Sequence, residues 1–224
     1  MVGKKESFGF FTMRLPHKTL EKSLFAKGYR KIIAVDEVGI GSLAGPVVVC
    51  AVSFSKSFFL KKHKNLHWLR DSKLLSPSQR VNFVRELLRE KALQYRIGYC
   101  FPKTIDRVNI YQAARLAMKR AISRLILSSK FYILNSIVLV DGPNKIKGLQ
   151  LRQMPIIKGD QKIFSIACAS LIAKVFRDKM MTRYAKRFSG YGFEKHKGYG
   201  TKFHRAMLLK HGRCLIHRSS FRLV

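Results

Sequence analysis

Residues 31–54, KIIAVDEVGIGSLAGPVVVCAVSF, contain the features that decide the fold. A strand is predicted over Lys31–Val35 and another over Val47–Phe54, because both are short apolar runs rich in β-branched residues. A glycine-containing turn separates the two runs, and Pro46 marks the start of the second strand. The sheet therefore begins with two strands that are close in the sequence.

Helices and strands alternate after this start. Ser76 as N-cap, Pro77 at the first helical position and Gln79 at the capping-box position predict a helix that runs to about Lys91. The remaining patterns predict a strand at 93–100, a helix at about 105–127, a buried strand at 136–140, a helix at about 161–187 capped by Asp160, and a last helix near 202–210. This order indicates an α/β layer architecture with a mixed sheet.

The chain organisation favours one catalytic domain. The sequence has 224 residues, no internal repeat and no linker rich in Gly, Ser or Pro. Residues 1–30 are predicted to be a basic lead-in, and residues 31–224 the catalytic domain. A monomer is the default expectation.

The charge balance predicts a polyanionic partner. Lys and Arg total 45 against 12 Asp and Glu, which gives a formal net charge of +33. Nucleic acid and an anionic membrane both attract such a surface, and composition favours nucleic acid, although a cationic surface that binds nothing is the alternative.

Targeting signals and metal-binding cysteine patterns are not found in the sequence. No apolar run approaches the roughly 18 residues that a membrane-spanning helix needs. The N-terminal residues do not resemble a secretory signal, so a cytoplasmic protein without membrane contact is expected. The four cysteines form no CxxC pair, which argues against a zinc site.

The positions of the few acidic residues point to a catalytic site. Asp36 and Glu37 follow the first strand, and Asp141 follows the strand at 137–140. Asp178 lies on the helix face that is expected to pack on the sheet. Carboxylates that converge at one sheet end repel each other unless cations compensate, so we expect a Mg²⁺ or Mn²⁺ site. A pair of such ions would suit phosphodiester hydrolysis.

Simpler interpretations remain open for each acidic residue. Aspartate at a strand end is often a turn residue. Asp160 is expected to cap a helix rather than bind metal, and Asp178 has Lys174 and Arg177 as candidate ion-pair partners. Spacing alone leaves the reaction undecided.

Seven segments between Val35 and Phe221 form a recognisable series. They are VDEVGIGSLAGPVV (35–48), DSKLLS (71–76), IDRVNIYQAARLAMKRA (105–121), VDGP (140–143), IIKGDQKIFSIACASLIAKVFRDKMM (156–181), GYGFEKHKGYGT (190–201) and HRSSF (217–221). In these segments and in their order the sequence resembles ribonuclease HII, the bacterial type 2 ribonuclease H.

The resemblance implies a ribonuclease H-like fold with a mixed five-stranded sheet and helices packed on it. It implies catalysis by Asp36, Glu37, Asp141 and Asp178, with Mn²⁺ or Mg²⁺ as cofactor. The implied substrates are RNA–DNA hybrids and DNA duplexes with an embedded ribonucleotide. The implied cut lies 5′ of the ribonucleotide and leaves a 3′-hydroxyl and a 5′-phosphate.

The resemblance also implies substrate contacts. The backbone of the turn Gly39-Ile40-Gly41 would approach the ribose 2′-hydroxyl, and Tyr199 would stack on the neighbouring sugar. Lys73 matches a family lysine near the substrate phosphates. An ordinary β-turn, a packed aromatic ring and one more surface lysine are the alternatives.

One position departs from the family pattern. Ile40 stands where the family usually has Arg between the two glycines. A guanidinium that holds phosphate is therefore absent, and weaker or less selective binding at the RNA–DNA junction is expected.

Three alternative interpretations compete with this one. A non-enzymatic protein that keeps this fold would bind nucleic acid without turnover. A resolvase or transposase, with similar carboxylates, would cut all-DNA substrates. The related ribonuclease HIII is disfavoured because about thirty leading residues cannot supply its additional N-terminal domain.

Overall fold

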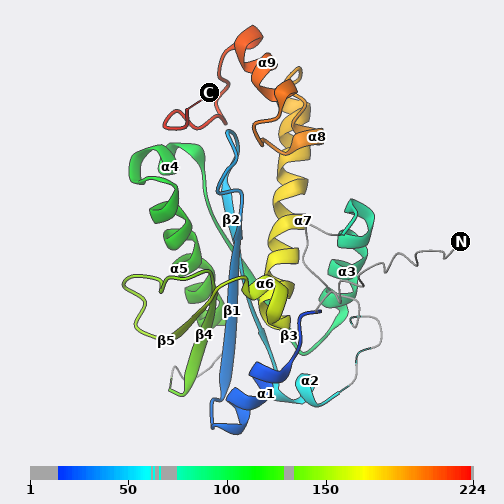
Figure 1. Cartoon of the computed structure of the whole chain (residues 1–224), viewed down its shortest axis with the longest axis vertical. Helices are drawn as coiled ribbons and strands as arrows, with labels where there is room; N and C mark the ends of the chain where they lie inside the picture. The colour runs from blue at the N-terminus through cyan, green and yellow to red at the C-terminus, as the bar shows by residue number, and fades with distance from the viewer. Residues whose placement is uncertain (1–14, 62, 64–65, 67–74, 129–133, 223–224) are drawn as a thin grey trace, which may run out of the picture.

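A five-stranded mixed sheet forms the centre of the protein in the computed structural model, which describes residues 15–61, 63, 66, 75–128 and 134–222 (Figure 1). The strand order is β3-β2-β1-β4-β5. Strands β1, β2 and β3 pair antiparallel, whereas β4 and β5 run parallel to β1. The bounds are β1 Lys31–Val38, β2 Val47–Phe54, β3 Leu93–Cys100, β4 Ser136–Asp141 and β5 Arg152–Ile156. The predicted mixed sheet of five strands is confirmed.

Helices cover both faces of this sheet (Figure 1). One apolar cluster joins the sheet to α7, with α1, α2 and α3 around it, and a second joins the opposite face to α4 and α5. The bounds are α1 Thr19–Ala26, α2 Lys56–Leu60, α3 Pro77–Arg89, α4 Pro102–Val108, α5 Ile110–Ser128, α6 Gly159–Lys162 and α7 Phe164–Arg187.

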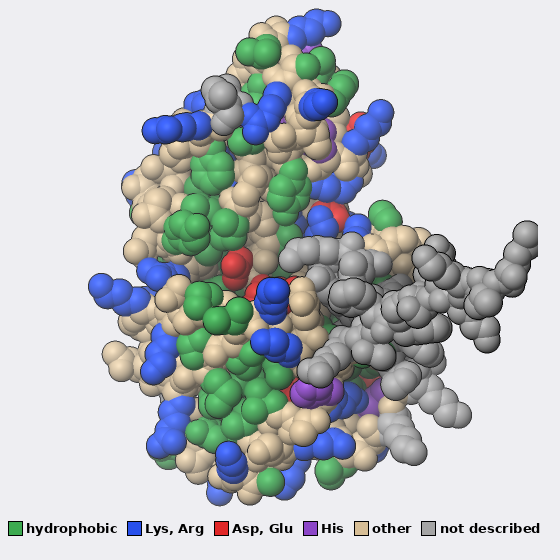
Figure 2. Space-filling view, viewed as in Figure 1, with side chains coloured by type: hydrophobic (Ala, Val, Ile, Leu, Met, Phe, Trp, Pro, Cys, Tyr) green, Lys and Arg blue, Asp and Glu red, His purple; other side chains and the backbone are tan. Residues whose placement is uncertain are grey.

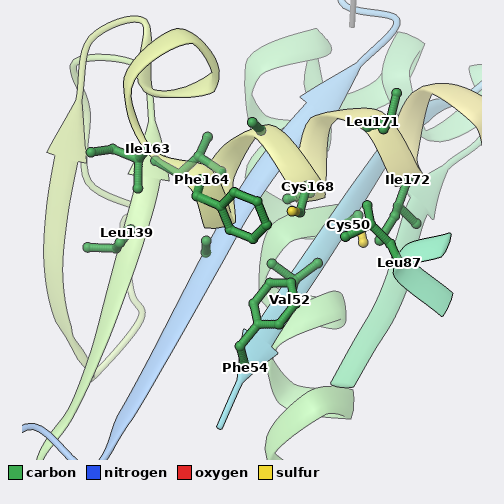
Figure 3. Packing of buried hydrophobic residues seen from close by; sticks show 14 of the residues in the cluster. Cys50, Val52, Phe54, Leu87, Leu139, Ile163, Phe164, Cys168, Leu171 and Ile172 are labelled. Atoms are coloured by element: carbon green, nitrogen blue, oxygen red, sulfur yellow. The ribbon is translucent and has the colours of Figure 1, made fainter. Parts of the chain in front are cut away.

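Buried apolar side chains fix α7 against the sheet. The Phe54 ring of β2 lies 5.7 Å from the Phe164 ring at the start of α7, measured between centroids. Cys50 and Cys168 are also fully buried at this contact (Figure 3). Both act as small buried hydrophobes.

The N-terminal helix α1 belongs to the same core. Leu24 and Phe25 are buried in the cluster that contains α7. Glu21 is fully buried, and its Oε1 accepts the Ser165 backbone N–H at 2.9 Å. Part of the lead-in therefore anchors the first turn of α7.

Several predicted elements differ from those observed. The helix expected over 105–127 is two helices, because Asn109 adopts a positive φ of 64° between α4 and α5. Asp160 is not an N-cap, since it lies inside the short helix α6 and α7 begins only at Phe164. Strand β5 was not predicted. The capping box of α3 is confirmed, with the Gln79 N–H donating to Ser76 Oγ at 3.2 Å.

A third apolar cluster lies beyond one end of the sheet. It contains α8 Phe193–His196 and α9 Lys202–His211, together with the end of α7 (Figure 1). Leu43 and Ala44, from the turn that follows β1, are part of it. This cluster therefore holds the segment around the predicted substrate-contacting turn.

Candidate active site

Two carboxylates meet because their strands are parallel neighbours. Val35 of β1 pairs with Val140 of β4, so Asp36 and Asp141, the next residues, lie side by side at the same end of the sheet. Asp36 is only 4% exposed, and its Oδ1 accepts the Glu37 backbone N–H at 2.7 Å. The predicted convergence of these three acidic residues is confirmed by the geometry.

Helix α6 brings a further carboxylate, Asp160, to this edge. The Gly159 N–H donates to Asp141 Oδ1 at 2.6 Å, and a Cβ at Gly159 would come within 3.0 Å of the same oxygen. A side chain at this position would therefore crowd the Asp141 oxygen and the Ile166 side chain. Lys158, one residue earlier, adopts a left-handed conformation with φ 55°. The chain is bent here so that Asp160, 7% exposed, faces the other acids.

The electrostatics of Asp36 reflect this crowding. Burial raises the pKa of Asp36 well above its ordinary value, and the carboxylates of Glu37, Asp141 and Asp160 raise it further. A hydrogen bond from Ser170 on α7 opposes the shift. Like charges held this close favour a bound cation or a proton.

The acidic residues line a cavity of about 570 Å³. Its wall consists of Asp36, Glu37, Val38, Arg80, Asp141, Asp160, Ser170, Lys174 and Tyr199. Within the described residues, no group of three His, Cys, Asp or Glu side chains is arranged to enclose a metal ion. The carboxylates thus border an open space rather than a closed cage.

Asp178 lies in a neighbouring cavity instead. It is not among the residues that line the acidic cavity, and its Oδ1 accepts the Lys174 Nζ–H at 2.9 Å. Its Oδ2 lies 3.9 Å from Arg80 Nη2. The ion pair with Lys174 that the sequence allowed is therefore present. Sequence analysis missed Asp160, although its place in the segment KGDQK, beside a glycine, was the available signal.

Two buried arginines, Arg218 and Arg177, pack against the glycine turn. Arg218 donates to the carbonyl oxygens of Gly39 at 2.6 Å, Ile40 at 2.8 Å and Gly45 at 3.1 Å. Arg177 approaches Gly39 so closely that a Cβ there would lie 2.3 Å from its Nε. Gly39 also has a φ of +96°, so this glycine is required twice over.

This arrangement leaves the amide side of the turn available to a ligand. Within the described part of the chain, the N–H groups of Gly39, Ile40 and Gly41 donate to no acceptor. A Cβ at Gly41 would meet nothing within 4 Å. The turn is therefore held by its carbonyl oxygens.

Replacing Arg218 by Lys is expected to destabilise the fold by about 3 kcal/mol, because one ammonium cannot donate to all three carbonyl oxygens in place of the guanidinium. Arg218 is 1% exposed, so no water replaces the missing donors. Urea unfolding of the variant and the unchanged protein measures the difference. A free energy of unfolding within 1 kcal/mol of the original, on the order of one ordinary hydrogen bond, would contradict this role.

A histidine relay holds Tyr199. His217 Nδ1 accepts the Cys214 N–H at 2.9 Å, which places the ring proton on Nε2. His217 Nε2 lies 3.0 Å from His204 Nε2, so the His217 N–H donates and the His204 nitrogen accepts. His204 Nδ1 in turn donates to the Tyr199 carbonyl oxygen at 2.9 Å. Neutral histidines thus fix the backbone of Tyr199 at the border of the acidic cavity.

Acidification is expected to weaken this relay. Burial, and then the His204 ring, lower the pKa of His217 from 6.5 to about 4. The folded protein then binds this proton more weakly than the unfolded chain, so stability is present above pH 6.5 and is lost as the pH falls through 4. The complete loss corresponds to roughly 3 kcal/mol.

Urea unfolding between pH 7 and pH 4 measures this loss, and the variant His217→Gln provides the control. Glutamine has a donor and an acceptor but does not titrate. Its loss of stability in this pH window should be smaller than that of the unchanged protein. Equal losses would show that other groups dominate the acid response.

The remaining residues that were predicted to contact substrate have the following positions. Tyr199 forms a bridge with Ser42, so the turn and the tyrosine are adjacent. Ile40 lines a small cavity between the turn and α5, together with Glu37 and Asp141. Lys73 lies outside the described residues.

The surface around the site is basic. Figure 2 shows acidic side chains near the middle of one face, with Lys and Arg side chains distributed around them. No helix among the described residues has the length and apolar character that crossing a membrane requires.

Comparison with known proteins decides the family. Residues 33–224 match the family model described as Ribonuclease HII. The chain belongs to the ribonuclease HII family. A ribonuclease HII from Caldicellulosiruptor saccharolyticus is 45% identical over 90% of this chain and 92% of its own length.

Solved structures agree with the ribonuclease HII assignment. The ribonuclease HII of Archaeoglobus fulgidus, solved in a complex with PCNA, is 25% identical, with a TM-score of 0.64 over 87% of this chain and 96% of that chain. A Bst ribonuclease HIII solved with Mn²⁺ shares the fold at 16% identity, with a TM-score of 0.62 over 85% of this chain and 65% of that chain. The chain is therefore a ribonuclease H with the predicted fold, a nuclease from a family that acts on nucleic acid and depends on divalent metal.

Proposed function

We propose that this chain acts as a monomeric endonuclease that cuts the RNA strand of hybrids and the 5′ side of ribonucleotides embedded in duplex DNA. The products would be a 3′-hydroxyl and a 5′-phosphate. The observation that carries the proposal is the convergence of Asp36, Glu37, Asp141 and Asp160 around one cavity beside the glycine turn. Membership of the ribonuclease HII family supports the substrate class.

The donor set fits Mg²⁺ or Mn²⁺. Carboxylate oxygens are the hard ligands that both ions prefer, and an open cavity leaves positions for water and phosphate oxygens. The mutual repulsion that raises the pKa of Asp36 would be relieved by positive charge. Two bound cations would supply activation of the attacking water and stabilisation of the leaving 3′-oxygen.

We assign the four carboxylates that line the cavity as the metal-holding residues. Asp160 is the fourth metal-holding residue because it lines the same cavity as Asp36, Glu37 and Asp141. Asp178, the candidate from the sequence, pairs with Lys174 in the neighbouring cavity. Gly159 keeps Asp141 oriented through its N–H.

The glycine turn and Tyr199 would select the substrate. The N–H groups of Gly39 and Gly41, which meet no acceptor among the described residues, would donate to a ribose 2′-hydroxyl, which DNA lacks. Tyr199 borders the acidic cavity, and its backbone is fixed through its carbonyl oxygen, which supports a role for its ring in stacking on a neighbouring sugar. The glycine turn and Tyr199 both lie in the region that Arg177 and Arg218 hold in place.

The deciding experiment uses a labelled DNA duplex with one ribonucleotide, next to an all-DNA duplex of the same sequence. Each is incubated with Mg²⁺, Mn²⁺ or EDTA. We expect a metal-dependent cut 5′ of the ribonucleotide and none in the all-DNA duplex. Cleavage of both duplexes would indicate a general DNA nuclease. No cleavage of either, with a long RNA–DNA hybrid also intact, would indicate a binding protein.

Installing arginine at Ile40 is expected to tighten binding to the ribonucleotide-containing duplex by about tenfold, because one charge-assisted phosphate contact is gained. The side chain would start from the cavity that contains Glu37 and Asp141, beside the substrate. Fluorescence anisotropy in EDTA measures the affinity, and Ile40→Gln is the uncharged control. Equal affinities for the two variants would contradict a phosphate contact at this position.

A further inference from the structure

A second cavity, of about 640 Å³, continues from the acidic one. It lies between the start of α3, one side of α7 and the α8 segment. The two cavities share Arg80, Lys174 and Tyr199 in their walls. A ligand that occupies the acidic cavity can therefore continue into the second without leaving the protein surface.

Positive charge dominates this second cavity. Seven of the fifteen residues that line it are Lys or Arg, against only two acidic residues, Asp178 and Glu194. Three of the basic residues, Lys179, Arg183 and Lys186, are exposed on α7 at helical spacing along one side. They extend over about 10 Å of the helix, the axial length of about three nucleotides of one strand.

We propose that this cavity binds the phosphodiester backbone of the substrate strand where it continues from the scissile bond. The inference rests on the proposed function and adds a phosphate subsite to it. Phosphates are the chemical match because they are dense, regularly spaced anions, and Lys and Arg are their usual partners. We name this cavity, the one lined by Arg183 and Lys186, the phosphate groove.

Asp178 supports the assignment because a carboxylate already occupies the inner end of the groove. It holds Lys174 at 2.9 Å and lies 3.9 Å from Arg80, on the boundary between the two cavities. A substrate phosphate is also an anion, so it can replace Asp178 as the ion-pair partner of Lys174 and Arg80. Asp178 is thus an internal counter-ion of the groove, which keeps Lys174 and Arg80 in place before substrate binds.

The test compares two double variants that each remove two positive charges. Arg183→Gln with Lys186→Gln changes the groove, and Lys22→Gln with Lys27→Gln changes the α1 region, which lies at the other end of the molecule (Figure 1). All four side chains are exposed, so both variants should fold, which thermal unfolding checks. Binding to the single-ribonucleotide duplex is measured by fluorescence anisotropy in EDTA over a range of salt concentrations.

The groove variant is expected to bind about tenfold to a hundredfold more weakly at about 0.1 M salt, with a salt slope lower by about 2, because two phosphate contacts are lost. The α1 variant should keep the slope of the unchanged protein. Equal affinities and slopes for the two double variants would overturn the proposal, since the groove would then be an ordinary solvated surface.

This measurement separates the groove from the catalytic proposal. Anisotropy in EDTA requires no cleavage, so a selective loss in the groove variant supports the groove even if the unchanged protein fails to cut. If the protein cuts 5′ of the ribonucleotide but the two variants bind alike, only the groove assignment is wrong.

Discussion

Replacing Asp36 or Asp141 by Asn is expected to abolish cleavage, with a loss of about 10³-fold or more in kcat, because each variant removes a negatively charged ligand from the metal site. Both side chains line the acidic cavity, and their strands place them side by side. Single-turnover cleavage of the ribonucleotide-containing duplex measures the loss.

Folding and binding should survive these changes. Burial and the neighbouring carboxylates raise the pKa of Asp36, so a neutral amide there removes repulsion, while its oxygen can still accept the Glu37 N–H. We expect the thermal midpoint of Asp36→Asn to equal or exceed that of the unchanged protein. Duplex affinity in EDTA should be retained. Cleavage that persists in either variant at more than about a tenth of the original rate would remove that residue from the site.

The second large effect distinguishes the two candidates for the fourth carboxylate. Asp160→Asn is expected to lower kcat by about 10²-fold or more, whereas Asp178→Asn should lower it by less than about tenfold. Asp160 lies among the other acids, and Asp178 is paired with Lys174 in the phosphate groove. The same single-turnover assay compares the two variants directly.

Binding gives an independent measure of the Asp178 variant. Removing its charge releases Lys174 and Arg80 for the substrate, so duplex affinity in EDTA should rise and its salt dependence should steepen. Asp160→Asn should change the salt dependence little. If Asp178→Asn instead abolishes cleavage while Asp160→Asn remains active, the assignment made from the sequence holds and ours fails.

Much of the fold was predictable because local patterns were strong. The strands at Val47–Phe54 and Leu93–Cys100 match their predicted bounds, since continuous or alternating apolar residues set them. The capping box at Ser76 fixed the start of α3. The acidic pair near the end of β1 and Asp141 at the end of β4 were placed together correctly, because parallel neighbouring strands end on the same side of a sheet.

The errors arose where tertiary contacts override local preference. Aspartate before a helical pattern usually caps a helix, but the hydrogen bond from Gly159 to Asp141 turns the chain so that Asp160 faces the cavity instead. Arg177 was considered only as an ion-pair partner of Asp178, and Arg218 was assigned no role, yet both are buried against the turn. Spacing in the sequence contains no information about which carbonyl oxygens an arginine will meet.

The parallel pairing of β1 with β4 also orders events during synthesis. Val35 can pair with Val140 only after more than one hundred further residues have been synthesised. Asp160 is added later still, on α6. While the ribosome is still making the first half of the chain, the nascent polypeptide is basic but has no complete set of carboxylates. The four carboxylates can therefore converge only after β4 and α6 have been synthesised and have joined the sheet.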